Sequence, residues 1–398
     1  MLLALSSTVV SAVKGLSAVG PRDARSRQVS LTRTSGMFFW GDNRANRGSS
    51  SGRPKMKMAR LSQSVLLAGA LSVAASTWAV AETWTVQTSM PSGSAIFKHV
   101  EAWGAKLKTL TSGRVTIQWV GGGAVVPHNQ TIDAVGQGIL QGDFTATVYF
   151  GGRDKVFAVM GDLIAGYDTP WQLLSYCYQG GGMDIFQEAF DKYTKKRVKV
   201  VGCAPYAKES FTSTIPIKSV ADMKGVKMRS PEGLAAEVFR RAGANPVGLP
   251  ASEVFTSLQK GVIQAADYSS YTEDESIGLH DIAKFPIYPG IHSMPIIHFT
   301  VSQNKWDALS AADKLAVDFW YRSTMMDLIQ KLEISDRTLV ARDRASKATT
   351  IINWTQAERD KLRNIAAGAW KDFAATSPLA KKAYESHMAF MKKMALLD

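Results

Sequence analysis

The chain has 398 residues, of which 45% are hydrophobic and 20% are charged. This composition is too apolar for a disordered chain, and the length is sufficient for two lobes of ordinary domain size. The formal net charge is +13, but residues 1–81 carry eleven basic and two acidic side chains, a net +9, which leaves only +4 for the rest. The basicity therefore belongs mostly to the amino-terminal segment, and nucleic acid is a poor candidate partner.

Residues 56–81 have the organisation of a secretory signal that starts inside the chain. Lys57 and Arg60 supply a charged start, residues 64–75 form an apolar run, and residues 79–81 offer the small side chains that a signal peptidase reads. The run is short for a transmembrane helix, and a buried core helix is the alternative reading. We therefore expect a mature chain that begins at Glu82 in the periplasm.

Two features remain open at this level. Residues 1–55 are rich in Ser, Arg and Gly, and they are either the product of a start codon assigned too early or a disordered leader. Cys177 and Cys203 are the only two cysteines. They can form a bridge in an oxidising compartment or remain two buried thiols.

The mature chain alternates strand and helix patterns, which predicts an α/β fold whose first lobe has a largely parallel sheet. From residue 306 onward the pattern is helical, with the form of a capping box at Thr355 and Glu358. Strands are predicted at residues 84–88, 115–119, 144–149, 198–201, 226–229, 246–247, 265–268 and 295–301, and helices at 96–110, 129–137, 171–178, 183–193, 234–241 and 252–260. Trp103 and Trp171 stand at helical apolar spacing and are predicted to be core residues.

No catalytic signature is visible in the sequence. Gly-x-Ser-x-Gly, His-Glu-x-x-His, P-loop and Gly-x-Gly-x-x-Gly patterns are all absent. The six histidines are scattered, and the spacing of His292 and His298 is a poor fit to a metal pair. The sequence therefore favours a binding protein over an enzyme.

Arg229 is the most informative single residue. It ends a predicted strand, because Ser230-Pro231 follows at once, and ligands bind at the carboxyl ends of strands in open α/β sheets. Its planar guanidinium can hold a carboxylate through two hydrogen bonds. A solvated strand arginine is the alternative that position alone leaves open.

Four stretches between residues 84 and 320 resemble the solute-binding proteins of tripartite ATP-independent periplasmic (TRAP) transporters. Each stretch is weak alone, but together and in order they are specific. They are residues 111–115 with 121–123; residues 220–229, whose arginine binds the ligand carboxylate in the family; residues 243–250 with 253–261; and Tyr288-Pro289-Gly290 with Gly180-Gly181-Gly182, which resemble the branch that binds 2-oxo and 2-hydroxy carboxylates.

The resemblance implies a two-lobed Venus-flytrap fold with a long carboxyl-terminal helical region. Lobe I would comprise residues 82–205 and about 293–325, lobe II residues 206–292, and residues 326–398 would pack on the lobes. The protein would capture a small organic carboxylate and deliver it to a small and a large membrane subunit. A helix-swapped homodimer and an amphipathic membrane anchor are further readings of the carboxyl-terminal region.

The resemblance also suggests ligand contacts beyond Arg229. Tyr149, Asp267 and Tyr268 fall where relatives place ligand contacts, and Asp267 with Tyr268 would accompany a sodium or calcium ion if one is bound. Two positions depart from the branch: Lys208 stands where a polar cation ligand is expected, and His292 where a carboxylate is expected. Lys208 can meet a second anionic group of the ligand or be solvated, and His292 is either a ligand contact or an ordinary loop histidine. No cofactor other than the possible cation is predicted.

Two alternatives to transport share the same scaffold. A periplasmic sensor or chemoreceptor input protein would use the same binding site with another partner. An enzyme on this fold is the other alternative, since fold alone does not fix function.

Overall fold

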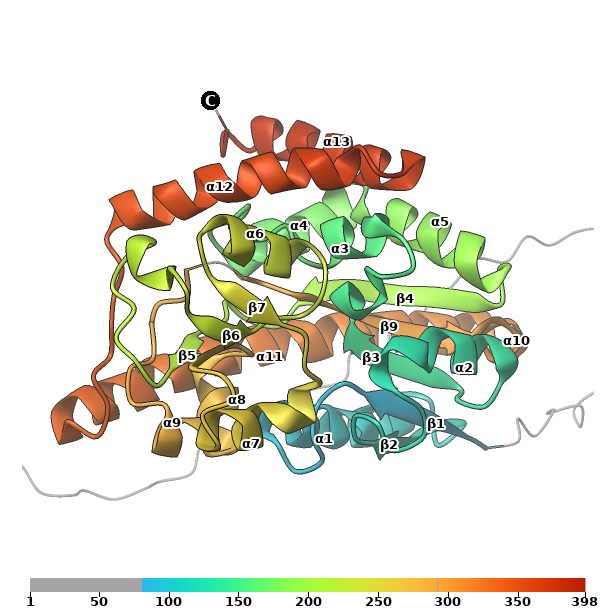
Figure 1. The fold of residues 1–398 in the computed structure, drawn as a ribbon. Helices are drawn as coiled ribbons and strands as arrows, with labels where there is room; N and C mark the ends of the chain where they lie inside the picture. The colour runs from blue at the N-terminus through green and yellow to red at the C-terminus, as the bar shows by residue number, and fades with distance from the viewer. Residues whose placement is uncertain (1–80, 292, 398) are drawn as a thin grey trace, which may run out of the picture. The chain divides into compact units, whose positions relative to one another are not determined.

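The computed structural model describes residues 81–291 and 293–397. The predicted leader and nearly all of the predicted signal segment lie outside the described residues, as does His292. The described chain forms two β-sheets flanked by helices, followed by three carboxyl-terminal helices (Figure 1). None of the described helices is long and apolar enough to cross a membrane.

The first sheet and its helices, here called lobe I, contain five strands in the order β2-β1-β3-β9-β4. β1 is parallel to β2 and β3, whereas β9 is antiparallel to both β3 and β4. The expectation of a largely parallel sheet is therefore wrong for half of it, because β9 runs against both of its neighbours. The elements are β1 (Glu82–Thr88), α1 (Ala95–Leu110), β2 (Val115–Val120), η1 (His128–Gln130), α2 (Thr131–Gln137), β3 (Gly142–Ala146), η2 (Thr147–Phe150), α3 (Lys155–Gly161), α4 (Pro170–Gln179), α5 (Gly182–Thr194), β4 (Val198–Pro205), β9 (Ile296–Ser302) and α10 (Gln303–Ala308).

The second sheet and its helices, here called lobe II, contain four short strands in the order β5-β8-β6-β7. β6 is parallel to β7 and β8, and β5 pairs antiparallel with β8. The elements are β5 (Phe211–Ser213), η3 (Ala221–Met223), β6 (Lys227–Arg229), α6 (Leu234–Arg241), β7 (Asn245–Val247), η4 (Ala251–Glu253), α7 (Val254–Gln259), β8 (Ala265–Asp267), α8 (Tyr271–Ser276) and α9 (Leu279–Ile282).

The chain crosses between the lobes twice, and the crossing segments are hydrogen-bonded to each other. Glu209 N donates to Ser293 O at 3.0 Å, and Phe211 N donates to Ile287 O at 3.2 Å. The outgoing and returning segments therefore form a paired hinge.

The carboxyl-terminal helices α11 (Ala311–Ser346), α12 (Gln356–Ala374) and α13 (Pro378–Lys393) tie both lobes together. α11 packs on α1 and β4 of lobe I and on α8 of lobe II, while α12 packs on α3 of lobe I and α6 of lobe II (Figure 1). Most of this region is helical as predicted, although residues 347–355 are not, and Thr355 accepts a hydrogen bond from Glu358 N at 3.3 Å. The boundary predicted near residue 325 falls inside the continuous helix α11.

Two local predictions in lobe I are wrong. The strand predicted at residues 144–149 ends at Ala146, and the next four residues form the 3₁₀ turn η2, which carries Tyr149. Trp171 is 43% exposed near the start of α4 rather than buried in the core. Trp103, in contrast, is partly buried against the core of lobe I.

A buried polar network holds the centre of the first sheet. The Asp143 carboxylate on β3 accepts hydrogen bonds from the hydroxyls of Thr131, at 2.6 Å, and Thr300, and lies 3.2 Å from His298 Nε2. The other ring nitrogen of His298 is 2.8 Å from the Thr147 hydroxyl. His298 is therefore a satisfied core histidine.

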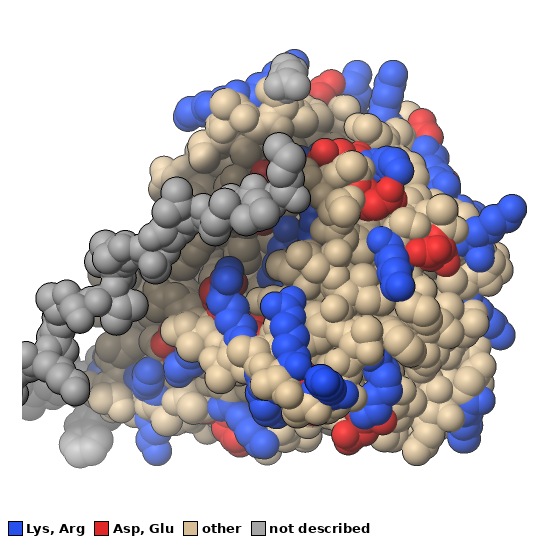
Figure 2. Space-filling view, turned by 90° about the vertical axis from the view of Figure 1, so that its left-hand side faces the viewer, with Lys and Arg blue, Asp and Glu red and all other residues tan. Residues whose placement is uncertain are grey.

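Charged side chains cover the surface as mixed signs. On the face seen in Figure 2, Lys and Arg side chains lie scattered with Asp and Glu between them. The ion pairs that Arg240 and Arg241 form with Glu237 on α6 are of this mixed kind. This pattern agrees with the small net charge that the sequence assigns to residues 82–398.

Candidate functional site

A cleft between the two lobes consists of two adjoining cavities of about 340 and 200 Å³. His128 and Tyr149 from lobe I and Pro250 from lobe II line both cavities. One wall is formed by residues between 122 and 129, and the opposite wall by residues 231–232 and 248–252. Gly122 allows the first wall to lie close to β1, since a Cβ there would be 2.8 Å from the carbonyl oxygen of Ser89.

Arg229 lies at the carboxyl end of β6, with only 1% of its surface exposed. Its Nε donates to Leu249 O at 3.1 Å, and its Nη1 donates to Asp267 O. These two bonds fix the direction of the guanidinium. Its Nη2 is buried and makes no hydrogen bond within residues 81–291 and 293–397. Since a buried donor without an acceptor costs roughly 1–3 kcal/mol, this atom marks a place for an acceptor.

Tyr149 connects the buried arginine to the open cleft. Its ring lines both cavities, and its hydroxyl lies beside the Arg229 guanidinium. Burial opposes the charge on Arg229, but Tyr149 and Asp267 outweigh it, and the pKa of Arg229 is raised. The arginine is therefore a permanent cation behind Tyr149.

Two buried carboxylates lie close to Arg229, and the pKa of one of them is strongly shifted. Glu209 is 3% exposed and Asp267 is 2% exposed. Burial and then the neighbouring charge of Asp267 raise the pKa of Glu209 well above its usual range. The Tyr206 hydroxyl donates to Glu209, and the Ser230 hydroxyl donates to Asp267 at 3.4 Å. Each of these two carboxylates therefore disfavours a negative charge on the other.

Tyr268 follows Asp267 and lies next to the same arginine. Its hydroxyl is buried and has no hydrogen-bond partner within the described part of the chain. Burial raises the pKa of Tyr268 well above its usual range, and Tyr149 and Arg229 are among its electrostatic neighbours. The structure thus brings together four of the six residues that the sequence predicted for the site: Arg229, Tyr149, Asp267 and Tyr268.

Lys208, another residue predicted for the site, is not in this group. Lys208 lines a separate cavity of about 490 Å³ together with Arg359 and Arg363 from α12. Its ammonium group donates to Asp168 O at 3.4 Å, and burial lowers the pKa of Lys208. His292 lies outside the described residues. Glu209, the neighbour of Lys208 in sequence, is instead the residue that lies beside Asp267.

His128 is a cleft residue that the sequence did not single out. It starts η1, and its ring contacts that of Tyr149 with centroids 4.4 Å apart. Burial and then the positive charge of Arg229 lower the pKa of His128, against a smaller opposing effect of Glu232. A lone histidine in a glycine- and proline-rich loop carries no spacing signal that could have identified it.

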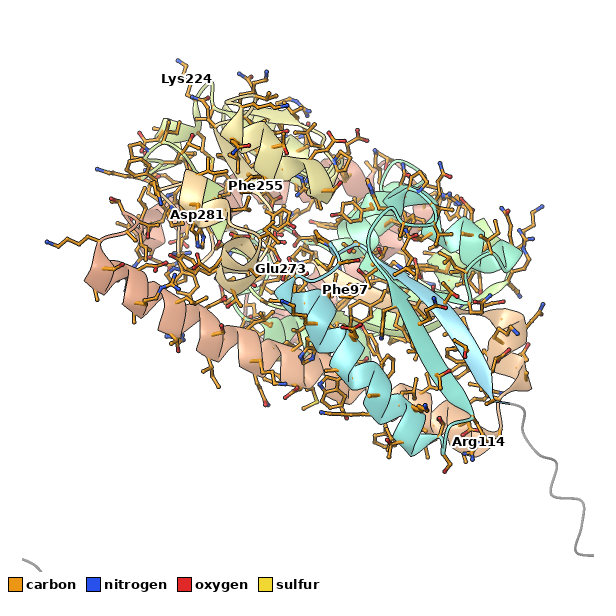
Figure 3. The ribbon with its side chains drawn as sticks, turned by 90° about the horizontal axis from the view of Figure 1, so that it is seen from below. Phe97, Arg114, Lys224, Phe255, Glu273 and Asp281 are labelled. Atoms are coloured by element: carbon orange, nitrogen blue, oxygen red, sulfur yellow. The ribbon has the colours of Figure 1, made fainter. Side chains whose placement is uncertain are left out.

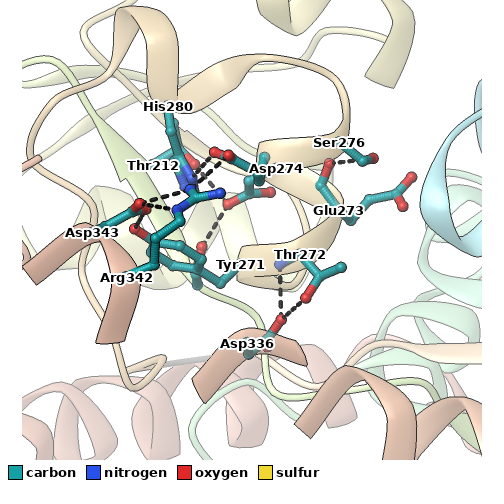
Figure 4. A network of polar contacts seen from close by, with 12 residues as sticks. Thr212, Tyr271, Thr272, Glu273, Asp274, Ser276, His280, Asp336, Arg342 and Asp343 are labelled. Atoms are coloured by element: carbon teal, nitrogen blue, oxygen red, sulfur yellow. Dashed lines mark hydrogen bonds and ion pairs between the residues drawn. The ribbon is translucent and has the colours of Figure 1, made fainter. Parts of the chain in front are cut away.

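Within residues 81–291 and 293–397, one group of side chains has the spacing of metal ligands. Glu275, His280 and Asp343 offer ligand atoms within 4.8 Å of one another. Arg342 donates 2.7 Å hydrogen bonds to both Glu275 and Asp343, and the Tyr271 hydroxyl donates to Asp343 at 2.7 Å (Figure 4). The arginine supplies the positive charge that a metal would bring, so this cluster reads as a link between α8 and α11.

A second carboxylate of α8 links lobe II to α1. Glu273 is buried and accepts a hydrogen bond from Ile96 N at 2.9 Å, in the first turn of α1. Figure 3 shows Glu273 next to this end of α1, near Phe97. The negative charge there favours the helix amino terminus, so α8 connects the strand that carries Asp267 to lobe I.

Two α/β lobes with a paired hinge, a cleft between them and a buried arginine behind Tyr149 of that cleft define the class of two-lobed solute-binding proteins. Residues 86–377 match the family model described as "Bacterial extracellular solute-binding protein, family 7". The chain belongs to this family, the solute-binding proteins of TRAP transporters, as the sequence resemblance predicted.

Individual relatives agree with this assignment. The chain is 26% identical over 312 residues to the monocarboxylate 2-oxoacid-binding periplasmic protein of Nostoc sp. strain PCC 7120, covering 78% of this chain and 84% of that one. The apo open structure of a TRAP periplasmic solute-binding protein from Rhodobacter sphaeroides is 37% identical, with a TM-score of 0.65, covering 79% of this chain and 99% of that one. A relative from Pseudoalteromonas atlantica, solved with sodium and pyruvate, is 22% identical, with a TM-score of 0.69, covering 79% of this chain and 95% of that one.

Proposed function

We propose that the cleft binds a small organic monocarboxylate, with the ligand carboxylate on Arg229. The observation that carries this proposal is the buried Nη2 of Arg229, which has no acceptor among the described residues. Nε and Nη1 are already held by carbonyl oxygens, so the guanidinium is oriented before the ligand arrives. A preorganised donor loses little entropy on binding. The neighbouring Tyr149 and Tyr268 hydroxyls add donors for the carboxylate and for an oxygen next to it.

A 2-oxo or 2-hydroxy acid is the ligand class that we propose. The Nostoc relative is named for monocarboxylate 2-oxoacids, and the Pseudoalteromonas relative was solved with pyruvate. An oxygen on the carbon beside the carboxylate would face the tyrosine hydroxyls. The cavity of about 340 Å³ has room for a compact acid of this kind.

We propose that a hard cation lies next to the ligand carboxylate, held by buried side chains beside Arg229. Glu209 and Asp267 present oxygen atoms, which sodium and calcium prefer, and a cation would oppose the burial and the carboxylate repulsion that raise the pKa of Glu209. We propose that these two carboxylates hold the ion that accompanies the ligand, with Asp267 as the residue common to this assignment and the sequence prediction. The cation would neutralise the pair and strengthen the field that Arg229 offers to the anion.

The physiological role that we propose is capture in the periplasm and delivery to the TRAP membrane subunits, without catalysis. The proposed lobes are residues 82–205 with about 293–325, and residues 206–292. Ligand binding would draw them together around the paired hinge, and the closed face would dock on the membrane subunits. We also propose that the chain can form a homodimer, which a measurement of its oligomeric state would test.

Thermal-shift screening followed by calorimetry tests this assignment. The panel contains 2-oxo, 2-hydroxy and aromatic monocarboxylates, dicarboxylates and sulfonates, each with and without a chelator. A monocarboxylate should bind, and Arg229→Gln should weaken it at least about tenfold, because a charged hydrogen bond contributes roughly 1.5–3 kcal/mol. Arg240→Gln, which removes an exposed arginine of α6, is the matched control.

Arg229→Lys separates charge from shape, since it keeps the cation and loses the planar fork. Its unfolding temperature shows whether any loss of binding is a loss of fold. Binding that survives in Arg229→Gln as in Arg240→Gln would remove Arg229 from the site. A panel without any binder would overturn the proposed function itself.

A further inference from the structure

His128 is placed where a ligand on Arg229 would meet lobe I. It lines both cavities of the cleft, and its ring packs on Tyr149 at a centroid distance of 4.4 Å with 59° between the planes. Three ionisable groups face it: Tyr149 from η2, Arg229 from the end of β6, and Glu232 from the loop before α6. His128 belongs to lobe I, whereas Arg229 and Glu232 belong to lobe II.

The surroundings of His128 in the cleft disfavour a positive charge on its imidazole. Burial removes water from the imidazole, and the fixed charge of Arg229 repels an imidazolium, so the pKa of His128 is lowered. Glu232 acts in the opposite direction but is more exposed and contributes less. An anion on Arg229 would cancel the repulsion and bring an acceptor close to the imidazole. Anion and proton would therefore favour each other's binding.

We propose that His128 takes up a proton when the organic anion binds and becomes the second recognition residue of the cleft. The inference rests on the proposed function and extends it to the lobe that Arg229 does not reach. The anion would then be held between Arg229 of lobe II and the imidazolium of lobe I. Such a bridge links the lobes and favours the closed form.

The bridge also implies a preference among ligands. An imidazolium donates a hydrogen bond, so His128 would favour acids with an acceptor on the side away from Arg229, such as a 2-oxo oxygen or the second carboxylate oxygen. The affinity for the anion would depend on the protonation of His128. It is highest below the pKa of His128 in the free protein and is lost as the pH rises through the higher pKa in the complex.

Calorimetry in buffers of different ionisation enthalpy tests this proton uptake directly. The probe is pyruvate, or the tightest-binding monocarboxylate of the panel if that is another acid. Near pH 6.5, roughly the ordinary pKa of histidine, the apparent binding enthalpy should vary with buffer ionisation enthalpy, with a slope equal to the fraction of a proton taken up. The dissociation constant should rise with pH by at most about tenfold per pH unit, the limit for one linked proton.

Three variants test whether His128 is the group that takes up the proton. His128→Gln removes the titrating group, and His128→Phe keeps the aromatic contact with Tyr149; both should bring the slope to zero and flatten the pH profile. Glu385→Gln, which removes an exposed carboxylate of α13, should keep the slope. A wild-type slope of zero, or a slope that both His128 variants retain, would overturn the inference while leaving Arg229 binding intact. A panel with no binder would instead remove the proposed function on which it rests.

Discussion

Asp336 on α11 should make the stability of this protein fall between mildly acidic and neutral pH. The side chain is 3% exposed, and its Oδ1 accepts hydrogen bonds from Thr272 N, at 2.8 Å, and from the Thr272 hydroxyl, at 2.5 Å (Figure 4). Burial raises the pKa of Asp336 from 3.8 to about 6. Asp336→Asn keeps an acceptor oxygen for both donors and removes the charge.

The direction and size of this change in the free energy of unfolding follow from the linkage between protonation and folding. A carboxyl whose folded pKa lies above its unfolded pKa loses stabilising free energy as the pH rises through that interval. At 1.36 kcal/mol per pKa unit, ionising Asp336 costs roughly 3 kcal/mol at about pH 7.5 and roughly 1.6 kcal/mol at about pH 5. The stability of the wild type relative to Asp336→Asn should therefore fall by about 1.4 kcal/mol between these two pH values.

Urea unfolding of both proteins at the two pH values measures this difference. The change with pH is diagnostic, because the new amide group adds its own hydrogen-bonding cost at both values. Glu385→Gln removes an exposed carboxylate of α13 and should leave the difference near zero. If the free energies of wild type and Asp336→Asn stay parallel from about pH 5 to about pH 7.5, the assigned protonation of Asp336 is wrong.

Three further predictions concern the interior. Gly202→Ala should lower the free energy of unfolding by about 1–3 kcal/mol in chemical denaturation, since the new Cβ would lie 2.2 Å from ring atoms of buried Tyr321; an unchanged midpoint would show that the ring moves freely. Asp143→Ala should cost about 3–5 kcal/mol by the same assay, because its buried donors lose their acceptor, and a cost below 1 kcal/mol, roughly one net hydrogen bond, would contradict that network. Cys177 and Cys203 are free and buried, and burial raises the pKa of Cys203; a thiol reagent should label both only after unfolding, and rapid labelling of the folded protein would contradict their burial.

The sequence predicted the fold best for elements whose own residues show a clear pattern of hydrophobic spacing and end signals. The bounds predicted for α6, residues 234–241, are those observed, because its apolar positions recur at helical spacing and its last turn ends in two arginines. The short strand β5 and the helices α3, α8 and α9 were not predicted. They are three to seven residues long, and such segments are fixed by their neighbours rather than by their own pattern.

Lys208 was predicted from the family resemblance, whereas the structure places the neighbouring Glu209 beside Asp267. β5 places Phe211 opposite Asp267 in the antiparallel pair. Side chains alternate along an extended chain, so Glu209, two residues before Phe211, shares the face of Asp267, and Lys208 points the other way. Without the register of β5, the sequence offered no means to choose between two adjacent charged residues.

Tyr149 and His128 show a different limit of sequence reasoning. Tyr149 was predicted at the end of a strand but belongs to a 3₁₀ turn, and it reaches the cleft because that turn follows the strand directly. His128 lies in a loop whose path is set by contacts such as that of Gly122 N with Met90 O, at 2.9 Å. A loop position of this kind depends on tertiary contacts, which hydrophobic periodicity does not encode.

The sequence could not show the features on which the proposed binding of an anion depends. Arg229, Glu209 and Asp267 come from three separate segments, and burying one of them alone would be prohibitively unfavourable. Together they are tolerable, because both carboxylates favour the positive charge on Arg229. The arrangement leaves one guanidinium nitrogen without an acceptor among the described residues. In the proposed function, a ligand carboxylate that reached this nitrogen would complete the hydrogen bonding of the buried cluster, and this would couple recognition of the anion to the stability of the closed lobes.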